Sequence, residues 1–133
     1  MARLSPPPAA HPDLVAVSPL GRAFYFAWQG LRYAWRSEKN FRLEVFIGLG
    51  ALTLGAYLDV DLAPIVLCCV LVLTLELFNT AIETTTDLLS PDYHPLAKIA
   101  KDTAAAAVLI ASLGAALVGL LLLGSPLWQR LSG

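Results

Sequence analysis

The sequence has few charged residues and no excess of one sign. Only 14% of its 133 residues are Asp, Glu, Lys or Arg, and the formal net charge is −1 at pH 7. Soluble domains carry about 25% charged residues, and nucleic-acid-binding domains carry clusters of Lys and Arg. The composition therefore argues against a water-soluble globule and against a nucleic-acid partner.

Cysteine and histidine are also scarce. The two cysteines, Cys68 and Cys69, are adjacent, and the two histidines are His11 and His94. Neighbouring cysteines cannot form an unstrained disulfide, and this set has too few ligands for a structural zinc site. Both cysteines are therefore expected to behave as small buried hydrophobic residues.

Two further features are missing. Residues 1–18 are rich in proline and lack the apolar core of a signal peptide, so we expect a disordered N-terminal tail. The chain contains neither a G-x-x-x-x-G-K-[ST] loop nor a kinase glycine-rich loop. Any nucleotide must therefore be held by side chains on helices.

Hydrophobic residues, in contrast, make up 57% of the chain. The runs without charge are 45–58, 62–75 and 103–129. Only the third exceeds the roughly 18 residues that a spanning helix needs, so the first two span only if charged flanks enter the membrane. The sequence thus predicts three transmembrane helices, over 41–58, 62–89 and 97–124. A short C-terminal tail is expected over 128–133.

The positive charges predict the orientation of these spans. Five of them precede or open the first span: Arg22, Arg32, Arg36, Lys39 and Arg42. Lys98 and Lys101 lie between the second and third spans, whereas the 59–61 turn has no positive charge. The positive-inside rule therefore places the N-terminus and the second connection in the cytoplasm, with Arg130 as an outer interfacial anchor.

Before the first span, residues 19–37 predict an amphipathic helix. Its apolar residues recur at spacings of three and four: Leu20, Phe24, Ala27, Trp28, Leu31 and Trp35. Arginines occupy the other face, which is typical of a helix that lies in the membrane interface. Packing onto a soluble core is the weaker interpretation, because the chain offers no such core. The predicted fold is an all-α membrane protein in which residues 19–127 form one domain of a surface helix plus three transmembrane helices.

The third span carries small residues at strict intervals of four: Thr103, Ala107, Ala111, Ala115 and Gly119. Small residues at this spacing let helices approach closely in lipid. We therefore expect this helix to pack against others and the protein to oligomerise.

The second span carries a polar face. Glu76, Asn79, Glu83 and Asp87 are separated by three, four and four residues, so they share one face of a helix. A carboxylate within the membrane costs at least ~2.5 kcal/mol. One explanation is ion pairing with Arg42, Lys98 or Lys101. The explanation we favour is function, because such a face suits a hard cation and proton chemistry on a lipid-borne substrate.

More polar residues gather at the cytoplasmic end of the predicted bundle. Lys101 can contact phosphate oxygens, and Asp102 can hold that lysine or a metal. Glu38, between the surface helix and the first span, is expected at the same level as Glu83. Two carboxylates at one depth can bind Mg²⁺ when a triphosphate supplies further oxygens. Glu76, the deepest acid, is the candidate base for a lipid hydroxyl.

The segment ELFNTAIE at 76–83, followed by Asp87 and by Ala100-Lys101-Asp102, closely resembles the prokaryotic diacylglycerol kinase family of membrane lipid kinases. The resemblance covers about 20–124 and includes Glu38, Asn40, Phe41, Arg42 and Glu44. It implies a homotrimer of three-span protomers in the cell (inner) membrane, with Mg²⁺-ATP on the cytoplasmic side and active sites shared between subunits.

The same resemblance implies roles for individual residues. Glu76 corresponds to the general base, and Glu38 and Glu83 correspond to the Mg²⁺ ligands. The groups that orient ATP and substrate correspond to Asn79, Asp87, Lys101 and Asp102.

The substrate expectation depends on the stretch from Ser90 to Asp102, which is similar to the branch of the family that phosphorylates undecaprenol. Ala104-Ala105 also stands where the enterobacterial diacylglycerol branch carries Gly-Ser. We therefore favour undecaprenol, with diacylglycerol as the alternative. An alternative of a different class is a small protein that conducts protons or cations. It would explain the acidic face of the second span, but not why Glu38, Lys101 and Asp102 gather at the cytoplasmic end of the predicted bundle.

Overall fold

A computed structural model describes residues 18–133, which form four α-helices and no strand. The tail predicted over 1–18 lies outside the described residues except for Ser18. The Ser18 hydroxyl accepts a hydrogen bond from the Gly21 N–H at 3.1 Å and so caps the first helix. The described chain divides into two compact units after Tyr33.

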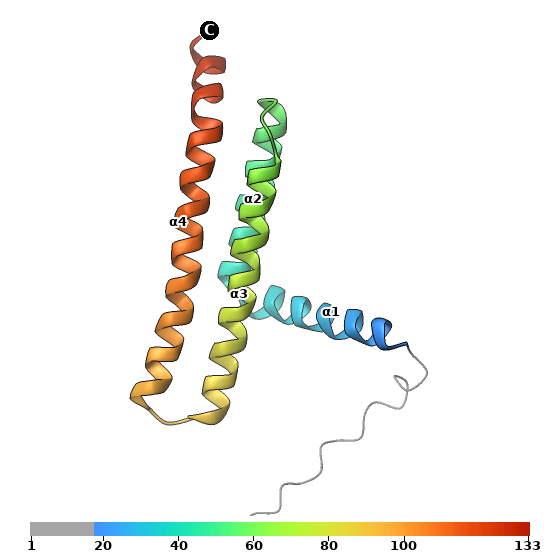
Figure 1. The fold of residues 1–133 in the computed structure, drawn as a ribbon, viewed down its shortest axis with the longest axis vertical. Helices are drawn as coiled ribbons and strands as arrows, with labels where there is room; N and C mark the ends of the chain where they lie inside the picture. Colours follow the sequence, from blue (N-terminus) through green and yellow to red (C-terminus); the bar gives the residue numbers. More distant parts are fainter. Residues whose placement is uncertain (1–17) are drawn as a thin grey trace, which may run out of the picture. The chain divides into compact units, whose positions relative to one another are not determined.

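Helix α1 spans Pro19–Ser37 (Figure 1). Its aromatic side chains are exposed, among them Phe24, Trp28 and Trp35, and Ala34 is its only buried residue. The spacing of apolar residues thus correctly predicted the helix, whereas its place in a membrane interface stays a prediction.

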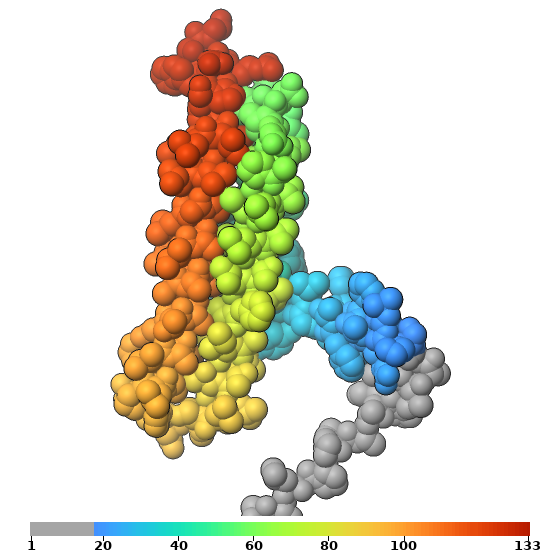
Figure 2. Space-filling view, in the orientation of Figure 1, coloured from blue at the N-terminus to red at the C-terminus, as the bar shows by residue number. Residues whose placement is uncertain are grey.

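The second unit contains three helices: α2 over Lys39–Tyr57, α3 over Ala63–Leu89 and α4 over Pro95–Ser132. Helices α3 and α4 lie side by side along most of their length, and α2 packs mainly against α3 (Figures 1 and 2). Helix α4 continues beyond the span predicted over 97–124 and includes all but Gly133 of the tail predicted over 128–133. Pro126 lies within it without ending it.

The core of this unit is a narrow stripe along α3. Ile65, Val72, Glu76 and Thr80 are buried, at spacings of seven, four and four residues. These spacings place the four side chains on one face of the helix. The stripe is apolar toward the α2–α3 turn and polar toward the α3–α4 connection, so the packing face of α3 includes the predicted base, Glu76.

Most large apolar side chains lie outside this stripe. Exposed examples on α3 and α4 are Leu67, Leu71, Ile110, Leu113 and Leu121. Both helices are long and apolar enough to cross a membrane. Helix α2 does not meet that test, since Lys39, Arg42 and Glu44 occupy its first turns. The structure therefore supports two of the three predicted spans by length and composition.

The α2–α3 turn is tightly built. Asp59 adopts a left-handed conformation with φ 57°, which Asp tolerates better than most residues. The Asp61 carboxylate accepts a hydrogen bond from the Ala63 N–H at 3.0 Å and caps α3. At the same end, the Arg130 guanidinium lies 5.4 Å from the centre of the Tyr57 ring and links α4 to α2.

At the opposite end, the α3–α4 connection reverses the chain within a few residues. The Ser90 hydroxyl donates to the Asp92 carbonyl at 3.0 Å. Pro95 begins α4, and His94 Nδ1 accepts a hydrogen bond from the Leu96 N–H at 3.2 Å. This cap fixes where α4 starts, and with it the register of Lys98, Lys101 and Asp102.

Candidate active site

The predicted polar face of α3 is present, and burial decreases along it. Glu76 is only 3% exposed, Asn79 and Glu83 are half-buried, and Asp87 is exposed. The spacing of three and four residues sets the common face, and packing against α2 and α4 sets the gradient. The deepest carboxylate is thus the one predicted as the base.

Asn79 orients one of these acids. Its Nδ2 donates a hydrogen bond to Glu83 Oε1 at 3.0 Å. Its own Oδ1 is buried and has no hydrogen-bond partner. Buried amide oxygens are rarely left without a partner, so this atom is available to accept from a ligand.

Glu38 is the single residue between α1 and α2. It has an extended backbone (φ −96°, ψ 113°), and its side chain makes no capping hydrogen bond to α2. The charges of Glu38 and Glu83 both act on Glu76. Glu38 at the α1–α2 junction and Glu76 and Glu83 on α3 therefore form an acidic group. Its three carboxylates are not close enough together to hold one metal ion among themselves.

Arg42 does not pair with this group. Its Nη1 donates to the carbonyl oxygens of Trp35 at 2.7 Å and Arg36 at 3.3 Å. These carbonyls belong to the last turn of α1, where no intrahelical donor remains. Arg42 therefore caps α1 from the first turns of α2 and fixes the backbone on both sides of Glu38.

Two ion pairs lie at the α3–α4 connection. Lys101 Nζ lies 2.8 Å from Asp87 Oδ1, and Lys98 pairs with Asp102 one helical turn away. Three of the four side chains are well exposed and that of Lys101 is partly exposed, so each pair contributes little stability. Within residues 18–133 neither pair includes Glu76, so the ion-pairing explanation applies to Asp87 but not to the deepest acid.

These charged groups border a hollow of about 430 Å³. Its wall includes Asp87, His94, Lys98, Lys101 and Asp102. Both signs of charge are present, and the exposed lysines can exchange their carboxylate partners for phosphate oxygens.

Glu44 is a site residue to which sequence reasoning gave no role. It lies on α2, its Oε2 is buried without a hydrogen-bond partner, and the charge of Glu76 acts on it. Its position as the last charged residue before an apolar stretch of α2 was the available signal. Only the packing of α2 on α3 shows that it faces the acidic group.

The metal expectation can be compared with the donors present. Among residues 18–133, no three His, Cys, Asp or Glu side chains gather closely enough to hold a metal ion. The acids do offer hard oxygen donors, and Asn79 adds an unpartnered oxygen. This set suits Mg²⁺, which is usually bound through one or two carboxylates together with substrate phosphates and water.

Comparison with known proteins agrees with the resemblance. Residues 25–123 match the family model described as prokaryotic diacylglycerol kinase. A diacylglycerol kinase of Synechocystis is 44% identical over 79% of this chain and 62% of its own length. The diacylglycerol kinase of Escherichia coli K12 is 40% identical over 78% of this chain and 88% of its own. The undecaprenol kinase of Bacillus subtilis is 35% identical over 76% of this chain and 85% of its own length.

Proposed function

Because this chain belongs to the prokaryotic diacylglycerol kinase family, whose members are ATP-dependent lipid kinases, we propose that it transfers the γ-phosphate of ATP to the primary hydroxyl of a membrane lipid alcohol. The observation that carries the proposal is Glu76, a carboxylate only 3% exposed on a membrane helix, with no cation paired to it in the part of the chain that is described. A buried acid that stabilises nothing by ion pairing calls for a chemical role.

Glu76 acts as the general base. Phosphoryl transfer passes through a loose transition state, so the protein mainly positions the reactants and neutralises charge. A lipid hydroxyl that reaches Glu76 from the bilayer donates its proton to the carboxylate while its oxygen bonds to the γ-phosphorus of ATP. The bond from that phosphorus to the β,γ-bridging oxygen breaks at the same time, and ADP leaves. The buried position of Glu76 keeps water from competing as the acceptor of the phosphoryl group.

Glu38 and Glu83 would hold Mg²⁺ together with ATP oxygens. The bound ion would neutralise charge on the triphosphate. Asn79 holds the Glu83 carboxylate in place through its amide N–H group. Its free Oδ1 is a further acceptor for the substrates.

Lys101, Asp102 and Asp87 orient the nucleotide. When ATP enters the hollow at the α3–α4 connection, the ammonium groups of Lys98 and Lys101 turn from carboxylates to phosphate oxygens. Asp87 and Asp102 limit where these lysines can move. Because both ion pairs are accessible to solvent, breaking them costs little free energy.

Undecaprenol is the substrate that we favour, because the stretch from Ser90 to Asp102 is similar to the undecaprenol branch. Diacylglycerol is the second candidate, since the relatives of 40% identity or more reported above are named diacylglycerol kinases. The conductor interpretation loses its support, because all the relatives reported above are named kinases.

A direct competition tests the reaction and the substrate together. The purified protein in a bilayer, given ATP and Mg²⁺ with undecaprenol and diacylglycerol side by side, should phosphorylate undecaprenol with the higher kcat/KM. The reverse preference would establish diacylglycerol as the substrate. Phosphorylation of neither lipid would overturn the proposed function.

The cellular setting belongs to the same proposal. Helices α2, α3 and α4 each cross the cell (inner) membrane, α1 lies in its cytoplasmic interface, and the N-terminus and the nucleotide side are cytoplasmic. Three copies assemble into a homotrimer. Cysteine labelling from the two sides of sealed vesicles would test this topology, with Asp59 and Asp92 as substitution sites on opposite sides.

A further inference from the structure

Within residues 18–133, Thr80 is the one buried polar residue to which the proposed mechanism gives no role. The other buried polar residue is Glu76, and the two side chains are 8% and 3% exposed. They lie about one helical turn apart on the packing face of α3. A hydroxyl is costly to bury unless it is hydrogen-bonded, so the partner of the Thr80 hydroxyl indicates what this residue does.

The Thr80 hydroxyl is bonded to the backbone of Glu76. Thr80 Oγ1 donates a hydrogen bond to the Glu76 carbonyl oxygen at 3.0 Å. Thr84 repeats the contact one turn later, where its hydroxyl donates to the Thr80 carbonyl at 2.8 Å. In an α-helix each of these carbonyls also accepts from the backbone N–H four residues further along. The hydroxyl is therefore a second donor, which restricts how the peptide plane of Glu76 can tilt.

The type of bond does not by itself distinguish Thr80. Thr53 on α2 donates to the Leu49 carbonyl at 2.8 Å, and Thr103 on α4 donates to the Ile99 carbonyl at 2.8 Å. Both of these threonines are exposed, and this contact is a common way for a threonine within a helix to satisfy its hydroxyl. Thr80 differs because it is buried and because the carbonyl it holds belongs to the proposed base.

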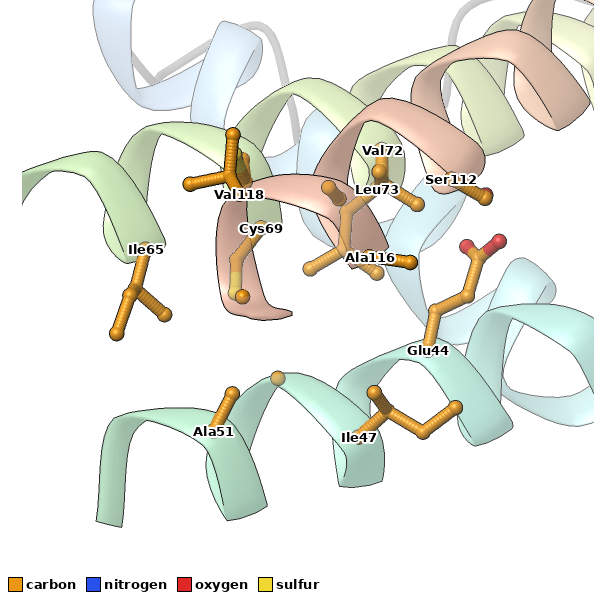
Figure 3. Close-up of a pocket in the computed structure, with 14 residues that line it drawn as sticks. Glu44, Ile47, Ala51, Ile65, Cys69, Val72, Leu73, Ser112, Ala116 and Val118 are labelled. Carbon is orange, nitrogen blue, oxygen red and sulfur yellow. The ribbon is translucent and has the colours of Figure 1, made fainter. Parts of the chain in front are cut away.

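Packing alone does not require a hydroxyl at this position. Val72 lies about two turns earlier on the same face and is buried to the same degree, 7% exposed against 8% for Thr80. It lines an apolar cavity of about 290 Å³ between α2, α3 and α4 (Figure 3). A valine has nearly the shape of threonine and would fill the place of Thr80 without burying a hydroxyl. The hydroxyl therefore calls for an explanation other than packing.

Glu76 has few contacts that fix its orientation. Its carboxylate has no ion-pair partner in the part of the chain that is described, and the apolar packing that buries it is non-directional. On the turn before it, Val72 and Leu73 border the cavity, where lining atoms lack neighbours on one side. The direction of the carboxylate therefore depends on the backbone of its own turn, to which Thr80 is bonded.

We propose that Thr80 is a positioning residue for the phosphoryl transfer: its hydroxyl holds the Glu76 peptide so that the carboxylate meets the hydroxyl of the lipid alcohol. The inference rests on the proposed kinase function and adds a residue that acts through the base and not on the reactants. A shift of about 1 Å in a catalytic group can lower a rate by about 100-fold, so one hydrogen bond to the backbone of the base has a measurable effect.

Two substitutions of Thr80 separate positioning from packing. Thr80→Val keeps the shape and removes the hydroxyl, so kcat should fall by about tenfold while the KM values for ATP and lipid stay unchanged. Its melting temperature should stay close to that of the parent protein, because the Glu76 carbonyl keeps its backbone donor. Thr80→Ser keeps the hydroxyl and removes a buried methyl group, so kcat should stay near the parental value while the melting temperature falls.

Thr53→Val is the matched control. It removes the same kind of hydrogen bond from an exposed position on α2, and its kcat should equal that of the parent protein. A structural role for Thr80 predicts that kcat follows the melting temperature in both of its variants. That result, a kcat for Thr80→Val within about twofold of the parent, or an equal loss in Thr53→Val would overturn the proposal.

A spectroscopic measurement follows the hydrogen bond without turnover. In protein labelled with ¹³C at the backbone carbonyl of glutamate, the Glu76 signal should move upfield in Thr80→Val, because the carbonyl loses one of its two donors. It should stay in place in Thr80→Ser and in Thr53→Val. An unchanged signal in Thr80→Val would overturn the proposal. A parent protein that gives the expected carbonyl signals but phosphorylates no lipid would overturn the kinase function instead.

Discussion

At the scale of single residues, the substitution of Glu76 separates catalysis from stability. Glu76→Gln is nearly isosteric and should lower kcat strongly with little change in the apparent KM for ATP. Because Glu76 has no paired cation among the described residues, its loss should leave thermal stability equal or higher. Steady-state kinetics and a melting curve in the same detergent measure both effects.

The opposite combination, unchanged turnover with reduced thermal stability, would give Glu76 a structural role. A Glu76→Gln protein with near-parental turnover and a lower melting temperature would mean that the carboxylate supports packing. Glu44→Gln offers a comparison, because Glu44 is also partly buried beside the acidic group but is not the proposed base. It should lower kcat less than Glu76→Gln does.

The two proposed metal ligands should respond differently from the base. Glu83→Gln should abolish phosphorylation while folding and insertion remain intact, because Glu83 would be lost as a Mg²⁺ ligand. Glu38→Gln should raise the Mg²⁺ concentration needed for half-maximal rate. Magnesium titrations of purified variants measure this shift. The control is Asp59→Asn at the α2–α3 turn, away from the hollow, where Asn also tolerates the left-handed conformation.

An unchanged Mg²⁺ titration for Glu38→Gln would remove Glu38 from the metal site. The alternative role of this residue, a helix cap, already has little support, because its side chain makes no capping hydrogen bond.

At the scale of helices, two glycines of α2 give a test of how tightly this helix packs near the α2–α3 turn. A Cβ at Gly55 would lie 2.8 Å from Leu62 Cδ2 and 3.0 Å from Ile65 Cδ1, whereas a Cβ at Gly50 would meet nothing within 4 Å. Alanine favours a helix over glycine by about 0.5–1 kcal/mol, and crowding a packed site costs about 1–3 kcal/mol. Gly50→Ala should therefore raise the melting temperature, and Gly55→Ala should lower it.

Thermal unfolding of both variants in one lipid measures that difference. Equal stabilisation by the two substitutions would mean that Leu62 and Ile65 move aside at no cost, and that the turn is looser than its packing indicates.

The features of these helices that the sequence predicts are those that depend on the spacing of residues along one helix or on neighbouring residues. The polar face of α3 follows from residues three and four apart, and the capping of α4 next to Pro95 follows from local chemistry. The position of Glu44 beside Glu76 depends on how α2 and α3 pack, which no spacing within α2 encodes. Arg42 was considered as an ion-pair partner, whereas its role as a cap for α1 depends on the one-residue break at Glu38.

The same reasoning explains the outcome for the small residues of α4. They were expected to provide contact with other helices, and Ala115 and Gly119 do face α2 and α3, but across a cavity rather than in close contact. A stripe of small residues indicates that helices can approach, while the distance they keep is set by neighbouring side chains.

At the scale of the whole molecule, the protein has little core of its own. Its buried apolar residues within 18–133 are few and mostly small or aliphatic, while many large ones are exposed. Lipid can cover these surfaces, but so can further copies of the chain. The proposed homotrimer would let one copy contribute Lys101 and Asp102 to the acidic group of the next.

Mixed oligomers test whether sites are shared. Co-expressed Glu76→Gln and Asp102→Asn subunits should regain activity that neither variant has alone, because some interfaces combine two intact residues. For random mixing around a closed ring, roughly a quarter of the sites would be intact. Activity of the purified mixture measures this, and a mixture no more active than its components would show that each site belongs to one subunit.

The one-residue junction at Glu38 has a consequence for insertions and deletions. Each residue of an α-helix turns the chain by about 100°. One added residue before Arg42 would therefore rotate its guanidinium away from the Trp35 and Arg36 carbonyls, which it now holds. The length of the junction is therefore fixed by the angular relation between the two helices, independently of the role proposed for the Glu38 side chain. Natural relatives should show neither insertions nor deletions there.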